Sequence, residues 1–284
     1  MFWALRAQES ENRMARAQFA EVQAEKVSWR GEMMDEVEID ATNLSTRELN
    51  DRLRDLMQAG VEKVVLRNVC GQRYIGTRLY SPEHRKMKIE IFGTPGNDLA
   101  AFLFGHEIIV HGNAQDGVGN TMDAGEIVVE GRAGDVLGFS MRGGKIFIRD
   151  NVGYRTALHM KEYEEKSPVL VVGGTSQDFL GEYMAGGIVI LLGLGGMVHS
   201  GNFMGTGMHG GLIYLRGSIN ASQVGGHVEI SHLDEADRKI LERYVSEFME
   251  RFPDLGLNKD QILKDEFVRL SPRSKRPYGK LYAY

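Results

Sequence analysis

The stretch Gly134–Ile148 reads GDVLGFSMRGGKIFI, and its second half joins a Gly-x-x-Met-x-Gly-Gly unit to alternating apolar residues. The same unit returns in GNTMDAGEIVV from Gly119, GEYMAGGIVIL from Gly181 and GTGMHGGLIYL from Gly205. Self-similarity of this kind is typical of repeat architectures. The chain is therefore predicted to be built from copies of one structural unit.

The repeats align on the small or polar residue that ends each apolar run. These end residues are Asn68, Gly93, Gly112, Gly131, Asp150, Gly174, Gly193 and Gly217. Most successive copies lie nineteen residues apart, and the longer intervals are expected to carry loop insertions. Aliphatic residues stand two and four positions before each end residue. They are Val64, Leu66, Ile89, Ile91, Ile108, Val110, Ile127, Val129, Ile146, Ile148, Leu170, Val172, Val189, Leu191, Ile213 and Leu215.

This alternation has the period of a β-strand with one buried face, because successive side chains of a strand point to opposite sides. Polar residues such as Glu90, Glu130 and Arg149 are expected to face outward. No amphipathic helix separates the copies, which argues against the crossover helices of a Rossmann fold or TIM barrel. The pattern predicts an all-β fold, a single-stranded parallel β-helix of about eight coils.

Glycine is abundant, with 35 copies in 284 residues against a background of roughly 7%, whereas proline has only 6. We assign the repeated glycines to corners where φ is positive or where coils approach too closely for a Cβ atom. They are Gly119, Gly138, Gly143, Gly144, Gly181, Gly186, Gly187, Gly205, Gly210 and Gly211. The methionines Met122, Met141, Met184 and Met208 are expected to fill the interior.

Four regions follow from this pattern: an arm over 1–35, a capping helix over 36–60, the β-helix over 61–231, and a capping helix with a tail over 232–284. The open ends of a strand stack must be covered, which is why helices are expected there. In the first helix, Ser45 is the predicted N-cap, Glu48 completes a capping box and Gly60 ends the helix.

Composition argues against several classes of protein. The net charge of −5 gives no reason to expect nucleic acid or an anionic membrane as a partner. The longest apolar run, IVILLGLGGMV from Ile188, is too short to span a bilayer. The first thirty residues carry four glutamates and no continuous apolar core, so they do not resemble a secretory signal. A single cysteine, Cys70, can form neither an internal disulfide nor a cluster site, so a cytoplasmic protein is expected.

No residue pattern indicates catalysis, a metal site or a cofactor site. The eight histidines contain no HxH or HExxH, and GTGMHG over 205–210 is followed by a strand rather than by the helix of a dinucleotide fold. A polar column of Asp116, Asp135, Asp178 and Asn202 stands three residues before the repeat glycines. We interpret these side chains as capping their own turns, although stacked carboxylates could also bind a cation.

One coil departs from the pattern. After Asp150 the expected turn glycines are replaced by NVGYRTALHMKEYEEKSP, which carries Tyr154, Arg155, His159 and Lys161. Local violations of a consistent pattern tend to mark function. These four residues are candidates for contact with a partner or for lining a channel, and the alternative is a tolerated surface loop.

The chain resembles the GXGXG domain at the C-terminal end of the glutamate synthase large subunit, in its stand-alone form. The resemblance rests on VEIDATNLSTRELN, GNAQDGVGNTMDAG, DNVGYRTALHMKEY and FVRLSPRSKR, from about residue 37 to residue 278. The coils are also similar to those of the C-type subunit of formylmethanofuran dehydrogenase.

The first resemblance implies a right-handed β-helix without catalytic residues or a cofactor of its own. It implies a scaffold subunit that organises glutaminase and FMN- and iron–sulfur-containing synthase partners and supports ammonia passage for glutamate synthesis. A homo-oligomer is also compatible with it. The alternatives are a scaffold of the formylmethanofuran dehydrogenase type and an independent β-helix enzyme acting on polysaccharide, which would need clustered acids and bases on one face.

Overall fold

The computed structural model describes residues 36–80 and 85–274, so the arm predicted over 1–35 lies outside the described residues. The strands are β1 Glu36–Asp40, β2 Lys63–Cys70, β3 Lys88–Thr94, β4 Phe104–His111, β5 Ala124–Val129, β6 Lys145–Ile148, β7 Val169–Val172, β8 Ala185–Leu191, β9 Gly210–Arg216, β10 Val228–Ser231 and β11 Phe267–Pro272. The helices are α2 Thr46–Gln58, α3 Glu235–Arg251 and α4 Lys259–Lys264, with short 3-10 turns at Leu194–Gly196, Ala221–Gln223 and Pro253–Leu255.

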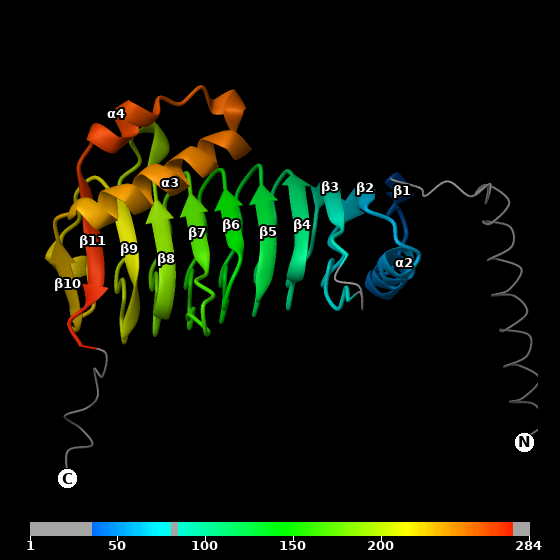
Figure 1. Cartoon of the computed structure of the whole chain (residues 1–284), viewed down its shortest axis with the longest axis horizontal. Helices are drawn as coiled ribbons and strands as arrows, with labels where there is room; N and C mark the ends of the chain where they lie inside the picture. The colour runs from blue at the N-terminus through cyan, green and yellow to red at the C-terminus, as the bar shows by residue number, and fades with distance from the viewer. Residues whose placement is uncertain (1–35, 81–84, 275–284) are drawn as a thin grey trace, which may run out of the picture. The chain divides into compact units, whose positions relative to one another are not determined.

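One sheet of eleven strands runs the length of this region in the order β1-β2-β3-β4-β5-β6-β7-β8-β9-β11-β10 (Figure 1). Strands β1 to β9 are parallel, and equivalent repeat residues face each other across them, as in the pair Ile108 and Ile127. All sixteen aliphatic residues that define the repeat have no exposed surface. The predicted register of the strands is therefore confirmed.

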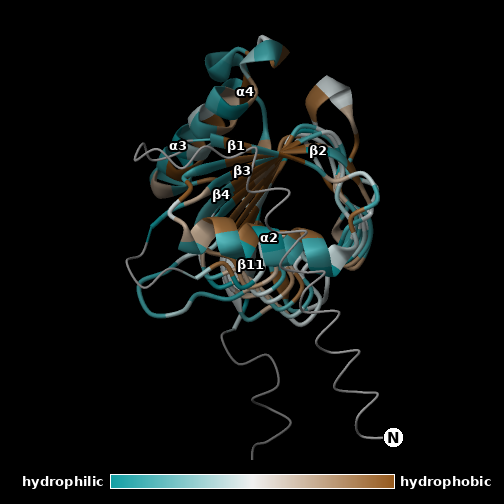
Figure 2. Ribbon diagram, turned by 90° about the vertical axis from the view of Figure 1, so that its right-hand side faces the viewer, coloured by the Kyte–Doolittle hydropathy of each residue, from teal (hydrophilic) through white to brown (hydrophobic). Residues whose placement is uncertain are grey.

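The chain between strands returns through turns on the other side of the buried core, which Figure 2 shows in a view along the stack. Successive turns bond to one another through the backbone, as where the Gly138 amide donates to the Val118 carbonyl and the Ala157 amide to the Leu137 carbonyl. The four repeat methionines are fully buried between the turns and the sheet, as predicted.

Helix α2 packs against the first repeats through Leu49, Leu53 and Met57. Its predicted capping box is confirmed, because the Glu48 amide donates to Ser45 Oγ and the Ser45 amide donates to the Glu48 carboxylate. Gly60, just after the C-cap, has a φ of 82°, the left-handed conformation that glycine supplies at helix ends.

Helix α3 lies across the outer face of the sheet rather than over the open end of the stack, where the sequence led us to expect it (Figure 1). Its apolar side chains form a second core with outward-facing residues of β5 to β9, including Phe147, Val171 and Tyr214. Salt bridges fasten it at Lys145–Glu247 and Arg251–Glu126. The tyrosine hydroxyl donates to the buried carboxylate of Asp237 at 2.7 Å.

The predicted fold class, an all-β parallel β-helix, is wrong. The structure is of the α/β type, with a single mixed sheet and helices packed on it. Each repeat contributes one strand and completes itself with turns, so the repeats do not close as β-coils. The last two strands, β11 and β10, are antiparallel to their neighbours, and the outer apolar column requires α3 as a covering layer.

Candidate partner-binding surface

The segment over 151–168 lacks the expected turn glycines, as the sequence indicates, and nevertheless keeps the repeat geometry. Ala157 takes the position of Gly138 with a φ of 63°, and Met160 takes the position of Met141 inside the core. The added residues form a small projection in which Tyr163 and Lys166 pair through their backbones.

Each turn uses three left-handed residues in alternate positions. The residue at the second position is glycine or alanine because a side chain there would point into the interior. The first and third positions accept large residues. Arg155, Phe179 and Phe203 occupy the first position of successive turns at φ values of 54°, 65° and 58°. His159 and Tyr183 occupy the third at 54° and 52°. The turn conformation thus presents these side chains in columns on the surface.

These columns stack. The Arg155 guanidinium lies 4.6 Å from the Phe179 ring centre, and the Phe179 and Phe203 rings are stacked at 5.0 Å. His159 stacks on Tyr183 at 5.3 Å, and Phe139 meets His159 edge-on at 6.2 Å.

We call these six residues, Phe139, Arg155, His159, Phe179, Tyr183 and Phe203, the aromatic strip. Phe203 is 54% exposed although it is a large apolar side chain. Arg155 is also held by a 3.0 Å bond from Nε to the Glu182 carboxylate.

Two of the four sequence candidates, Arg155 and His159, belong to the strip. Tyr154 is exposed, and its amide donates to Asp135 Oδ1. Lys161 is exposed and its amide donates to the Met141 carbonyl. The structure therefore brings two of the four candidates together and leaves the other two beside the strip.

Sequence reasoning missed the four aromatic members of the strip. Phe179 and Phe203 lie twenty-four residues apart, each directly after a residue of the polar column, and Tyr183 lies twenty-four residues after His159. That recurrence was visible in the sequence. The recurrence indicates a surface strip only when the residue after the polar column is known to point outward.

The polar column works between repeats rather than within a turn, which corrects the sequence interpretation. Asp116 Oδ1 accepts from the Asp135 amide, Asp135 Oδ1 from the Tyr154 amide, and Asp178 Oδ1 from the Asn202 amide, at 2.9, 2.9 and 2.7 Å. Each carboxylate satisfies a backbone donor one repeat further on.

The assigned glycines meet steric limits of two kinds. Seven have positive φ: Gly119, Gly138, Gly144, Gly181, Gly187, Gly205 and Gly211. At Gly143, Gly186 and Gly210 the limit is space, because an added Cβ atom would lie 2.1 to 2.5 Å from backbone atoms of a preceding repeat.

A family model described as the GXGXG motif matches residues 58–273, which is most of the chain. The chain belongs to the GXGXG family. The uncharacterized protein MJ1350 of Methanocaldococcus jannaschii is 49% identical over 257 residues, covering 88% of this GXGXG chain and 97% of that protein.

The fold is also found in a solved structure. This GXGXG chain is similar, at a TM-score of 0.56 and 17% identity, to a chain in the crystal structure of the formyltransferase/hydrolase complex of Methylorubrum extorquens with methylofuran. The similarity covers 86% of this chain and 93% of that one. Both resemblances noted in the sequence are thereby confirmed, the second as a likeness of fold.

Two buried histidines of the GXGXG chain hold backbone groups. His106 accepts the Met87 amide at Nδ1 and bonds the Leu79 carbonyl through Nε2, and His199 Nε2 bonds the Arg216 carbonyl. Burial lowers the pKa of both, and the bond to a carbonyl only partly offsets it.

The described part of the chain contains no group of three or more His, Cys, Asp or Glu side chains placed to hold a metal ion. Within the same residues, no helix is both long and apolar enough to cross a bilayer.

Proposed function

We propose that this chain is a non-catalytic scaffold subunit of a glutamate-synthase-type complex. In this role it organises a glutaminase and a synthase partner that carries FMN and iron–sulfur clusters, and it supports the passage of ammonia between them. The observation that carries the proposal is the aromatic strip, a set of large side chains held outward by strained turns on a repeating framework.

The strip has the composition of a protein interface. Aromatic residues and arginine are enriched among the side chains that dominate binding energy, and exposed clusters of them are uncommon on monomers. A residue other than glycine that adopts the left-handed conformation in such a turn costs about 1 to 3 kcal/mol of stability. Placing Phe179 and Phe203 there costs stability, and a partner that covers the rings offsets that cost.

Membership of the GXGXG family supports the glutamate-synthase assignment. The likeness of fold to a chain of the formyltransferase/hydrolase complex favours a second candidate, a scaffold subunit of a formylmethanofuran-dehydrogenase-like complex. The two candidates share the scaffold role and differ in the partners.

The test is purification of the native complex through the tagged full-length chain, with its other subunits identified by mass spectrometry. Glutaminase and flavin-containing synthase chains are expected, and formyltransferase or hydrolase chains would favour the second candidate instead. The variant Phe203→Asn should reduce the recovery of these partners, as should the triple variant Arg155→Ala, His159→Ala and Lys161→Ala.

Phe102→Asn is the matched control. Phe102 is also an exposed phenylalanine in a left-handed turn, with a φ of 59°, but it lies outside the strip. Asparagine tolerates this conformation, so both substitutions preserve the turn. Equal recovery of partners by Phe203→Asn and Phe102→Asn would overturn the role of the strip.

A further inference from the structure

The outer face of the sheet has two halves of different character. The residue between the two inward aliphatics of each strand is apolar in β5 to β9, where α3 covers it. Over β1 to β4 no helix of the described residues lies on this face (Figure 1). There the central positions are Glu38 in β1, the buried Val65 in β2, the partly buried carboxylate Glu90 in β3, and Ile109 in β4, which packs against the edge of the second core.

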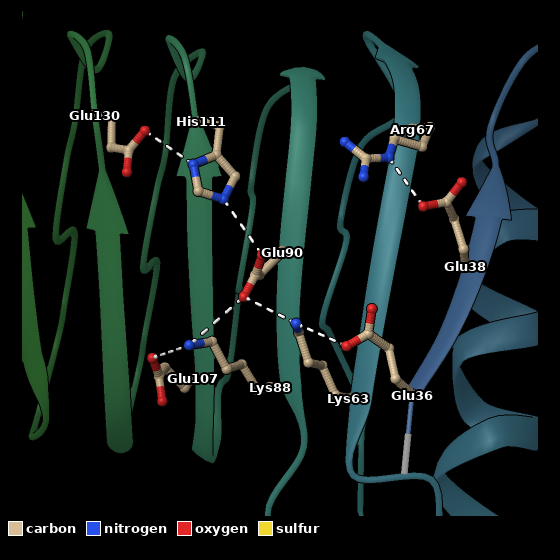
Figure 3. Close-up of polar contacts among 9 residues, drawn as sticks. All are labelled: Glu36, Glu38, Lys63, Arg67, Lys88, Glu90, Glu107, His111 and Glu130. Carbon is tan, nitrogen blue, oxygen red and sulfur yellow. Dashed lines mark hydrogen bonds and ion pairs between the residues drawn. The ribbon is translucent and has the colours of Figure 1, made fainter. Parts of the chain in front are cut away.

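A first row of charges crosses this uncovered half (Figure 3). Lys63 Nζ lies 2.8 Å from the Glu36 carboxylate and 3.5 Å from that of Glu90. Lys88 Nζ lies 3.6 Å from Glu90 and 3.4 Å from Glu107. Each lysine is therefore shared by two carboxylates of the chain itself.

A second row runs parallel to the first. Arg67 Nε is 3.0 Å from the Glu38 carboxylate, and its guanidinium lies 3.9 Å from the centre of the Phe92 ring. The Phe92 ring also stacks on His111 at 4.3 Å, and His111 Nδ1 is 2.9 Å from the Glu130 carboxylate. We call the two rows together the charged face.

The charged face has an excess of negative charge. Five carboxylates face three cations, and the neighbouring Asp40 adds a sixth carboxylate at the end of β1. Hydrogen bonds from Thr42 and Asn68 lower the pKa of Asp40 to about 2. Burial raises the pKa of Glu90, but the lysines and His111 outweigh it, so its pKa is lowered as well. The lowered pKa values favour the ionised forms of Asp40 and Glu90.

A groove continues the charged face beside the end of α3. It has a volume of about 500 Å³ and runs along the starts of β3 to β6. Its charged lining residues are the carboxylates Glu62, Glu107 and Glu126 and the cations Lys86, Lys88, Lys145 and Arg251, so the excess of negative charge lies in the two rows and not in the groove. Arg251, the last residue of α3, pairs with Glu126 there. The surface that α3 covers is therefore continuous with the charged face.

We propose that the charged face binds a second polypeptide through a surface rich in lysine and arginine. This inference rests on the proposed scaffold role, which needs a second binding surface besides the aromatic strip. The five carboxylates of the face outnumber its three cations, so its net attraction is for positive charge. A second copy of the chain would bring like charges together, and nucleic acid or an anionic membrane would be repelled.

The test is carboxyl labelling by a carbodiimide and glycine ethyl ester, read residue by residue, on the isolated chain and on the purified native complex. Glu36, Glu38 and Glu130 should be labelled several-fold less in the complex. Glu235 and Glu242 on the exposed side of α3 are the internal controls and should keep their labelling. Unchanged labelling of the charged face in the complex would overturn the inference.

Variants give a second, independent measurement. The pair Glu38→Lys and Glu130→Lys should weaken binding of one co-purified subunit by about tenfold and reduce its salt dependence between about 50 and about 300 mM NaCl. Glu38→Gln with Glu130→Gln should have a smaller effect, and Glu235→Lys with Glu242→Lys none.

These outcomes separate the two proposals. If Phe203→Asn loses a partner while the charged-face variants bind normally, the scaffold role stands and the charged face is only a solvated surface. If the wild-type chain purifies without partners, both proposals fail.

Discussion

Contacts between neighbouring repeats decide which residues the turns accept. The φ of Gly143 is not in the left-handed region, but a Cβ atom at this position would lie 2.3 Å from the Asp123 carbonyl oxygen. Gly226 has open space around the same position. Gly143→Ala should therefore lower the free energy of unfolding by about 1 to 3 kcal/mol, and Gly226→Ala should change it by less than about 0.5 kcal/mol. Urea denaturation measures both, and equal losses would refute the assigned packing.

The polar column gives a second prediction at this scale. Asp135→Asn keeps the acceptor oxygen for the Tyr154 amide and removes a charge stacked near Asp116, so stability should be nearly unchanged. Asp135→Ala leaves that amide without its acceptor and should cost about 1 to 3 kcal/mol. The two variants are compared by their urea midpoints. A neutral alanine variant would show that the bond between repeats contributes nothing.

At the scale of elements, the attachment of α3 depends on one buried carboxylate. Asp237 accepts from the Tyr214 hydroxyl on β9, from Arg269 on β11, and from the Asp234 amide at the helix start. Asp237→Ala should cost about 3 to 5 kcal/mol, because it leaves buried donors unpaired. Tyr214→Phe removes one of these bonds and should cost about 1 to 2 kcal/mol. Thermal or urea unfolding tests this order, which a smaller loss for Asp237→Ala would contradict.

His106 accepts the backbone amide just before β3, and His199 bonds the carbonyl of the last residue of β9. Because both imidazoles titrate, the free energy of unfolding depends on pH. Their pKa values are lowered in the folded chain from the usual 6.5, so the unfolded chain binds protons first as the pH falls. Stability should be unaffected by these groups above pH 6.5 and should decrease as the pH falls below it.

The double variant His106→Gln and His199→Gln should show a shallower decrease in stability between about pH 6.5 and pH 5. Glutamine at 106 can still accept and donate in the same direction as the histidine. Unfolding free energies measured across this range check the prediction. An unchanged slope in the double variant would assign the pH dependence to other groups.

The strand register could be predicted from sequence because it depends on local alternation, as in Ile108 and Val110. The position of α3 could not, since an amphipathic helix does not reveal which surface it covers. A signal was nevertheless present: the residues between the inward aliphatics include Val128, Phe147 and Val171, which are apolar where an exposed face would be polar. We expected that column to be polar and exposed because Glu90 belongs to it. No helix was therefore expected to cover the sheet, and the predicted fold class was wrong.

The candidate site was predictable only in part for a related reason. Arg155 and His159 stood out because they lie in the segment that lacks the expected turn glycines, but Phe179 and Phe203 sit in repeats that looked regular. Whether a turn residue points outward depends on its left-handed backbone, which becomes visible only when the turns are stacked in space.

At the scale of the whole described region, the buried core separates two surfaces of different chemistry. The turns carry the aromatic strip, and the sheet carries the charged face on its outer side. Because every repeat is bonded to its neighbours through the backbone, the distances between binding residues along the stack are fixed by the framework. Such an arrangement suits a subunit that sets the separation of two partners.

The most direct test of the scaffold role is the coupling of glutamine hydrolysis to glutamate formation in a complex reconstituted with and without this chain. With the wild-type chain, we expect the 2-oxoglutarate consumed to match the glutamine hydrolysed. Without it, or with the triple variant Arg155→Ala, His159→Ala and Lys161→Ala, hydrolysis should exceed consumption because ammonia escapes. The isolated chain should be colourless and inactive. Equal coupling with and without the chain, or turnover by the chain alone, would contradict the scaffold role.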